Sequence, residues 1–202
     1  MSEVLKSDKV INTGARIPSD SMILCITGMP GAGKTLAADF LRDERRFKIV
    51  EMGDVVRDAM TEKGLKINNV SIREFALKLR EEHGEDAVAK MVVDRVKKAG
   101  SNVVITGVRS INEIDYFRQA VRDISVIGII APRDVRYVRL RNRGRQDDLK
   151  TMDEFEFREE KEKRYGVLGA IDAADYVITN TGTLEELKSN ILGVLELIRK
   201  GS

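Results

Sequence analysis

The sequence predicts an α/β protein of the three-layer α/β/α type, in which helices cover both faces of a parallel five-stranded sheet. Short apolar runs alternate with longer segments of helical periodicity along most of the 202-residue chain. The first run is apolar throughout rather than at every second residue, as expected of a strand that is buried on both faces. Regular alternation of strands and helices favours parallel pairing of the strands. We find no internal repeat and no linker between domains.

Five segments have the character of strands. The first, Ile23-Leu24-Cys25-Ile26-Thr27, ends directly before a glycine-rich loop. The other four strands are predicted at residues 47–52, 102–106, 124–131 and 176–179.

Helical segments occupy the intervals between these strands, and several have recognisable ends. Ser71 with Glu74 and Thr151 with Glu154 have the spacing of capping boxes, in which a side chain binds a free backbone N–H at a helix start. Thr183 stands in the same relation to Glu186 before the last helix. We expect helices over residues 34–44, 54–63, 71–82, 86–99 and 112–121, and three more that begin at Pro132, Thr151 and Thr183.

Composition excludes several classes of protein. A single cysteine, Cys25, permits no disulfide within one chain, and one histidine, His83, offers no partner for a histidine metal site. No apolar stretch approaches the ~18 residues that a membrane span requires. We therefore expect a cytoplasmic protein without a membrane partner. Residues 1–21 are polar and aperiodic, so we interpret them as a flexible extension before a domain at 22–202.

The glycine-rich loop after the first strand carries the most specific motif in the chain. Its spacing, G-x-x-x-x-G-K-T, is that of a P-loop, whose curled backbone presents N–H groups to the phosphates of a nucleotide. The N-terminal end of the following helix adds positive potential. The motif comprises Gly28, Met29, Pro30, Gly31, Ala32, Gly33, Lys34 and Thr35, and Leu36 follows it.

This motif predicts a P-loop NTPase with ATP and Mg²⁺ as cofactors. Lys34 would reach the β- and γ-phosphates and act in catalysis, and the Thr35 hydroxyl would ligate the metal. We expect residues 28–36 to contact the nucleotide.

Two arginine motifs follow later strands. Gly53-Asp54-Val55-Val56-Arg57 comes after the second strand, and Gly107-Val108-Arg109 comes after the third. Arginines at the carboxyl ends of two parallel strands point to one crevice, where open α/β sheets bind ligands. The alternatives are a solvated Asp54–Arg57 pair on one helix face and a surface arginine at position 109.

With these motifs, the chain from Met22 to its end resembles the nucleoside monophosphate kinases, of which the adenylate kinases are best known. The resemblance implies that Arg57 and Arg109 hold the phosphate of the acceptor, with Asp54 and Gly107 beside them. It also places Glu113 where adenylate kinases use a glutamine to read the AMP base, and Thr106 where they have an aspartate. The glutamate argues against AMP itself, and the threonine leaves open how the metal is held.

The run from Arg139 to Asp148 resembles the lid of short adenylate kinases, so we predict a short arginine-rich lid at about residues 139–158. The resemblance implies that Arg139 stacks on the donor base, whereas Arg143 and Arg145 neutralise the transferred phosphoryl group. Arg158 resembles a further lid arginine. The alternative is a nucleic-acid surface, because Arg133 and Arg136 are also near in sequence. Two aspartates end the run, and their carboxylates would repel a polyanion, so we do not expect nucleic acid as the partner.

The segment from Asp175 to Leu187 is similar to the closing segment of dephospho-coenzyme A kinases. That similarity implies that Asn180 and Gly182 border the adenine of ATP. The simpler interpretation is a strand, a turn and a capped helix.

Taken together, the residues and the resemblance predict an ATP-dependent kinase that acts on a small phosphate-bearing acceptor. A nucleoside monophosphate is the first candidate, and dephospho-coenzyme A is the second. The remaining alternatives are an ATPase switch or regulator and a nucleic-acid-associated factor. The sequence resembles archaeal proteins described as adenylate-kinase-related. It leaves the oligomeric state open.

Overall fold

The computed structural model describes residues 22–144 and 151–201. The predicted extension at residues 1–21, and residues 145–150 of the predicted lid, lie outside the described residues. None of the described helices is long and apolar enough to cross a lipid bilayer.

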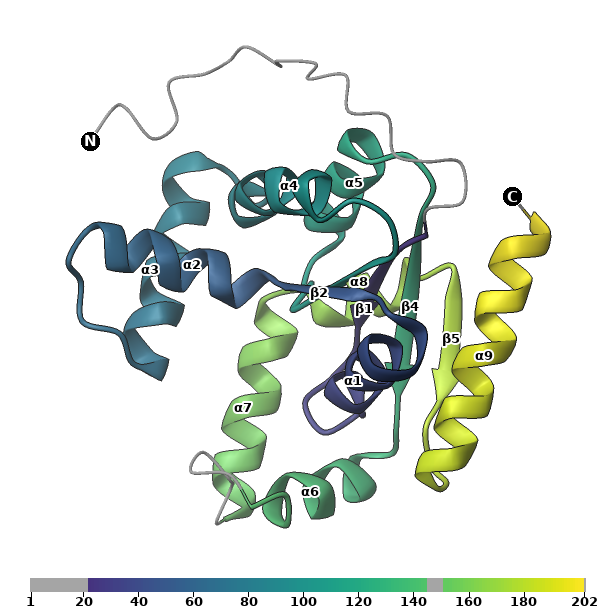
Figure 1. Cartoon of the computed structure of the whole chain (residues 1–202). Helices are drawn as coiled ribbons and strands as arrows, with labels where there is room; N and C mark the ends of the chain where they lie inside the picture. The colour runs from purple at the N-terminus through teal and green to yellow at the C-terminus, as the bar shows by residue number, and fades with distance from the viewer. Residues whose placement is uncertain (1–21, 145–150, 202) are drawn as a thin grey trace.

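Five parallel strands form one sheet in the order β2-β3-β1-β4-β5 (Figure 1). The first strand lies at the centre, where Ile26 is in register with Thr106 of β3 and with Ile127 of β4. This order brings the carboxyl end of β1 between the ends of its neighbours, which is where the P-loop begins. The strands are β1 (Ile23–Thr27), β2 (Lys48–Glu51), β3 (Val103–Thr106), β4 (Ile124–Ile130) and β5 (Tyr176–Thr179).

Helices cover both faces of the sheet, which gives the predicted three layers. They are α1 (Lys34–Arg45), α2 (Met52–Glu62), α3 (Asn69–His83), α4 (Ala87–Ala99), α5 (Ile111–Ala120), α6 (Arg133–Arg141), α7 (Met152–Arg164), α8 (Val167–Asp172) and α9 (Leu184–Gly201). Cys25 and Ile105 pack in one core with residues of α2, α4, α5 and α8, whereas Leu24 and Val104 pack in a second core with α1 and α9. Neighbouring residues of a strand therefore enter opposite cores, which explains why the strands are apolar throughout.

The five predicted strands and the helices around them are confirmed, but some ends differ and one helix was missed. Helix α2 begins at Met52, which was predicted to end the second strand, and not at residue 54. The helix α3 begins at Asn69, because Asn68 caps it by accepting hydrogen bonds from the backbone N–H groups of Val70 and Ser71. Ser71 is thus the third residue of the helix and not its cap, so the predicted start was wrong. The six-residue helix α8 was not predicted at all.

The P-loop leaves β1 at a point where only a glycine fits. Gly28 has a φ of +147°, and a Cβ atom there would overlap the backbone carbonyl oxygen of Ile129 in β4. A side chain would therefore be strained by its backbone conformation and would also push two strands apart.

We predict that Gly28→Ala lowers the free energy of unfolding by at least about 2 kcal/mol, because strain and overlap act together. The matched control is Gly193→Ala in the exposed face of α9, where a Cβ atom meets nothing within 4 Å. This control should gain about 0.5–1 kcal/mol, as expected for glycine to alanine within a helix. Urea denaturation measures both changes. Equal stability of the two variants would contradict the close approach of Gly28 to β4.

Candidate nucleotide and acceptor site

The P-loop lies between three other segments of the chain, each of which contacts one of its glycines. A Cβ atom at Gly31 would lie 2.7 Å from the carbonyl oxygen of Arg136 in α6, and one at Gly33 would overlap the side-chain amide of Asn180. Both glycines also have positive φ angles, of +81° and +110°. The glycine spacing thus reflects close packing against β4, α6 and the loop after β5, in addition to the curl that presents the backbone N–H groups.

Lys34 begins α1 and turns back over the P-loop. Its ammonium group donates hydrogen bonds to the carbonyl oxygens of Gly28, at 2.6 Å, and of Met29, at 3.0 Å. Burial in the protein lowers the pKa of this lysine from 10.5 to about 8. The charge of Glu162 opposes this effect, whereas nearby arginines add to it. An anion bound in the loop would restore the protonated form, and the contact with phosphates that the sequence predicts for Lys34 stays a prediction.

The next two residues face solvent at the first turn of α1. The side chain of Thr35 is exposed, and Leu36 is 50% exposed. A Thr35 hydroxyl suits Mg²⁺, which keeps several waters and takes phosphate oxygens when it binds with a nucleotide. Thr106 lies at the end of β3, in register with Glu51 at the end of β2. No cluster of three acidic, histidine or cysteine residues that could hold a metal ion occurs among the described residues. The exposed hydroxyl of Thr35 is therefore a donor that would fit a metal bound together with a nucleotide.

Asn180 fastens the loop after β5 to the P-loop. Its buried side-chain amide donates a hydrogen bond of 2.8 Å to the carbonyl oxygen of Ala32. Arg139 of α6 donates to the backbone carbonyl oxygen of Asn180 at 3.0 Å. The structure thus brings together Arg139, Asn180 and the P-loop, as expected for one nucleotide site. Gly182 is exposed two residues later, next to the carboxylate of Glu186 that caps α9.

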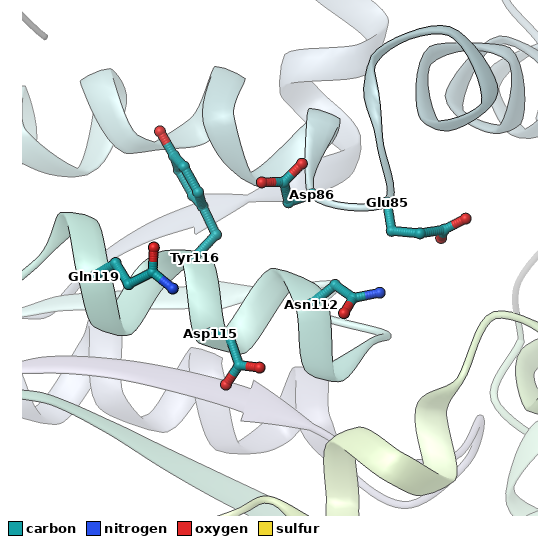
Figure 2. Close-up of a pocket in the computed structure, with 6 residues that line it drawn as sticks. All are labelled: Glu85, Asp86, Asn112, Asp115, Tyr116 and Gln119. Atoms are coloured by element: carbon teal, nitrogen blue, oxygen red, sulfur yellow. The ribbon is translucent and has the colours of Figure 1, made fainter.

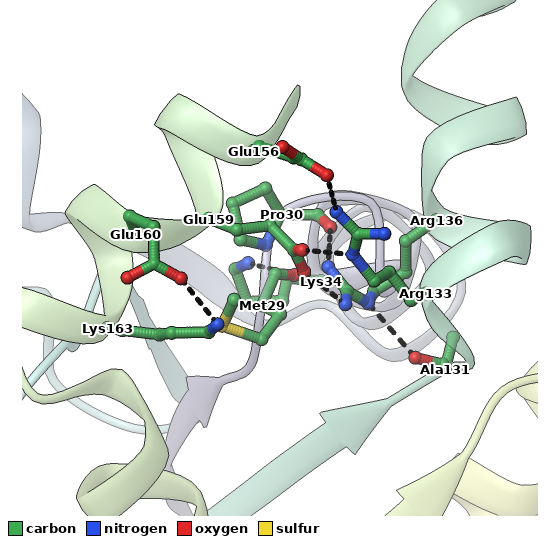
Figure 3. Close-up of polar contacts among 10 residues, drawn as sticks. All are labelled: Met29, Pro30, Lys34, Ala131, Arg133, Arg136, Glu156, Glu159, Glu160 and Lys163. Atoms are coloured by element: carbon green, nitrogen blue, oxygen red, sulfur yellow. Dashed lines mark hydrogen bonds and ion pairs between the residues drawn. The ribbon is translucent and has the colours of Figure 1, made fainter. Parts of the chain in front are cut away.

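A buried ion pair connects the P-loop to α7, and the sequence did not reveal it. Arg136 is 7% exposed and donates from Nη1 to the carbonyl oxygen of Pro30 at 3.3 Å, while its Nη2 pairs with Glu159 of α7 (Figure 3). Arg133 donates to Glu159 at 2.8 Å and to Glu156 at 2.7 Å. Burial acts to raise the pKa of Glu159, but hydrogen bonds from the guanidinium groups of Arg133 and Arg136 prevail and hold this pKa below its usual value. The regular spacing of arginines in α6 and of glutamates in α7 was the available signal.

A crevice of about 230 Å³ lies at the carboxyl ends of β2 and β3, at the same edge of the sheet as the P-loop that follows β1. Its walls come from α2, α3, α7 and the turn after β3, and carry several arginines. Arg57, Arg109 and Arg158 line it together, as does Gly107. The predicted acceptor residues from separate strands therefore do converge. The full lining is Glu51, Met52, Gly53, Val56, Arg57, Ile72, Arg73, Ala76, Arg80, Val88, Gly107, Arg109, Arg158, Glu162 and Tyr165.

The arginines at the strand ends have carboxylate partners. Arg57 pairs with Asp54 and lies 3.5 Å from Glu51. Arg109 donates to Glu162 at 2.9 Å and to the carbonyl oxygen of Gly107 at 3.3 Å. Asp54 and Arg57 therefore do form a pair on one helix face, as the alternative interpretation predicted. Arg57 nevertheless lines the crevice. Asp54 orients Arg57 and is not itself part of the lining.

Glu113 does not reach the crevice, so its predicted contact with the acceptor base is corrected. The residue is fully buried in α5. One carboxylate oxygen accepts from Arg80 of α3 at 2.7 Å, and the other accepts from the backbone N–H of Arg109 at 2.8 Å. The guanidinium of Arg80 lies over the ring of Tyr165, 5.7 Å from its centre. With both oxygens occupied, Glu113 positions Arg80 and the turn after β3.

The described residues include two parts of the predicted lid, 139–144 and 151–158. Arg143 is half-buried just beyond the end of α6, and Arg158 is half-buried in α7 beside the crevice. Arg145 lies outside the described residues, and its predicted role stays a prediction. Helices α6 and α7, which contain the two ends of the predicted lid, pack together through Leu140 and Phe155.

A second hollow, of about 340 Å³, lies elsewhere on the surface, between α5 and the turn before α4 (Figure 2). Its lining is polar and includes three carboxylates but no arginine or lysine, so it would repel a phosphate group. The lining residues are Glu85, Asp86, Asn112, Asp115, Tyr116 and Gln119. The candidate site is therefore the P-loop with the arginine-lined crevice.

Comparison with known proteins agrees with this architecture. Residues 24–165 match a family described as an AAA domain. A shikimate kinase from Bacteroides thetaiotaomicron superposes with a TM-score of 0.57 at 16% identity, over 87% of this chain and 98% of that one. A gluconokinase from Sinorhizobium meliloti superposes with a TM-score of 0.56 at 11% identity, over 90% and 95%. The chain therefore has the fold of the P-loop kinases.

The chain is also similar in sequence to archaeal proteins. A UPF0200 protein of Thermococcus kodakarensis is 38% identical over 183 residues, which cover 88% of this chain and 98% of that protein. The chain belongs to the UPF0200 family.

We predict that nucleotide binding is coupled to protonation of Lys34. In the free protein the lowered pKa leaves about half of these side chains neutral at pH 8, and a bound phosphate raises the pKa again. Binding of the non-hydrolysable analogue AMP-PNP with Mg²⁺ should therefore take up about half a proton at pH 8 and far less at pH 7. Isothermal titration calorimetry in buffers of different ionisation enthalpy measures this uptake.

The control is Lys34→Arg, because a guanidinium stays protonated at both pH values. Uptake that is equal in the wild type and this variant would show that another group supplies it.

Proposed function

We propose that the protein is an ATP-dependent phosphotransferase that acts on a small anionic acceptor held in the crevice. The observation that carries the proposal is that the P-loop and the crevice lie at the same edge of the sheet, near enough for charges of one to act on the other. Glu162, Arg109 and Arg158 line the crevice, and their charges are among those that act on Lys34 in the P-loop. An acceptor in the crevice would thus lie next to the terminal phosphate of a nucleotide in the P-loop.

Phosphoryl transfer requires positioning and neutralisation of charge more than a reactive side chain. The P-loop N–H groups and Lys34 would bind the β- and γ-phosphates, and Thr35 would hold Mg²⁺ beside them. Arg158 and Arg143, from either side of the lid, would stabilise charge on the transferred group. Asn180 and Arg139 would bound the nucleoside end of the site.

On the acceptor side, Arg57 and Arg109 offer planar forks of N–H donors that suit a phosphate or a carboxylate. A nucleoside monophosphate remains the first candidate acceptor because of the arginine motifs. The burial of Glu113 takes away the residue proposed to read its base. For this reason acceptors other than nucleotides belong in the same test, including shikimate and gluconate after the two kinases of similar fold.

An ATPase switch without an acceptor is the second candidate. It is favoured by the fact that Arg57 and Arg109 are already paired with carboxylates. A nucleic-acid-binding role has less support, because Arg133 and Arg136 of the arginine-rich stretch are engaged by Glu156 and Glu159.

We predict that one acceptor raises the rate of ADP release from Mg-ATP at least tenfold, because water is then replaced by an oriented nucleophile. The panel contains AMP, GMP, CMP, UMP, dTMP, dephospho-coenzyme A, shikimate and gluconate. Arg57→Gln should remove the stimulation and leave the affinity for ATP unchanged. A coupled assay for ADP measures the first effect, and calorimetry with AMP-PNP measures the second.

Arg95→Gln is the matched control. Arg95 is an exposed arginine of α4 that pairs with Asp58, much as Arg57 pairs with Asp54, but it does not line the crevice. It should keep the full stimulation. If no compound stimulates, and Arg57→Gln leaves basal hydrolysis unchanged, the protein is an ATPase switch.

A further inference from the structure

One arginine of the crevice differs from the others in its surroundings. Arg73 lies in the second turn of α3, lines the crevice, and is exposed. The sequence motifs assign no role to it. Arg57, Arg80 and Arg109 line the same crevice and each pairs with at least one carboxylate. Within residues 22–144 and 151–201, the side chain of Arg73 makes no hydrogen bond or ion pair.

This difference matters for binding. An anion that approaches Arg57 or Arg109 competes with Asp54 or Glu162 for the same donors. An anion that approaches Arg73 displaces no carboxylate among the described residues. The guanidinium of Arg73 therefore has no direct carboxylate partner in the described part of the chain, and an incoming oxyanion can bind it without breaking such a pair.

The neighbours of Arg73 on α3 indicate what accompanies the anion. Ala76 and Arg80 follow it at helical spacing and face the same crevice, as does Ile72. Ile72 and Ala76 form an apolar wall with Met52 and Val56 of α2. Arg80 is 9% exposed and fixed by Glu113, so it contributes to the wall more than to anion binding. The crevice thus combines an apolar surface with a free cationic group at one edge.

We propose that Arg73 is a binding residue for the acceptor, and that the acceptor carries an oxyanion, either phosphate or carboxylate, next to an apolar body. This assignment rests on the proposed function only in treating the crevice as the acceptor site. It defines the substrate class by two features, an anionic group that takes a planar fork of donors and an apolar part that packs on α2 and α3.

Anion binding with the P-loop filled tests the assignment. The wild type, Arg73→Gln and Lys78→Gln are each saturated with Mg²⁺ and AMP-PNP, and inorganic phosphate and succinate are titrated separately by calorimetry. Lys78 is a matched control, because it is an exposed cation of α3 that does not line the crevice. Thermal denaturation should show all three proteins to be equally stable, since Arg73 has no protein partner to lose among the described residues.

We expect Arg73→Gln to weaken binding of one anion at least tenfold, while Lys78→Gln stays within twofold of the wild type. An effect on phosphate alone identifies a phosphate-bearing acceptor, and an effect on succinate alone identifies a carboxylate. Equal affinities in the wild type and Arg73→Gln overturn the assignment, and so does failure of both anions to bind the wild type.

The outcome is separable from that for the proposed function. Binding that depends on Arg73 without any stimulated ADP release would keep the anion site and remove the phosphotransferase. Stimulated ADP release that is unchanged in Arg73→Gln would keep the phosphotransferase and remove the anion site at Arg73.

Discussion

The structure is organised around the ammonium group of Lys34 and the loop that surrounds it. Two carbonyl oxygens of the same loop hold this cation, in a position where burial makes its charge costly. The loop can adopt this form because its glycines contact β4, α6 and Asn180 directly. A phosphate group would satisfy the cation and the backbone N–H groups together, so the loop suits the phosphates of a nucleotide.

Helix α7 connects the P-loop with the crevice. One of its residues, Glu159, is buried against Arg136, which also binds the P-loop carbonyl of Pro30. Other residues of the same helix, Arg158 and Glu162, line the crevice. The P-loop and the crevice therefore share contacts with one helix. Such a shared element keeps two sites in register, as phosphoryl transfer requires.

Local patterns predicted much of this fold. The strands and the P-loop follow from short runs whose meaning does not depend on distant residues. The start of α3 was missed because Asn68 and Ser71 form a capping box with an uncommon pair of side chains. Helix α8 was missed because six residues with an internal Gly169 are too few to show helical periodicity.

The site was predictable where it depends on motifs and less so where it depends on packing. Resemblance placed Glu113 by its sequence position, but its role depends on Arg80, which approaches from a different helix. The Arg136–Glu159 pair joins residues 23 positions apart, and only the packing of α6 on α7 brings them together. Arg73 has no motif of its own, and its significance lies in the carboxylates that its neighbours have and it lacks among the described residues.

The most direct test of the account is to follow the γ-phosphoryl group itself. Mg-ATP labelled with ¹⁸O in that group is incubated with the protein and each candidate acceptor, and the products are examined by mass spectrometry. The account predicts that the label appears in an organic phosphate ester or anhydride of one acceptor, and that Lys34→Met abolishes this product. Label that enters only inorganic phosphate, whatever acceptor is present, would contradict it.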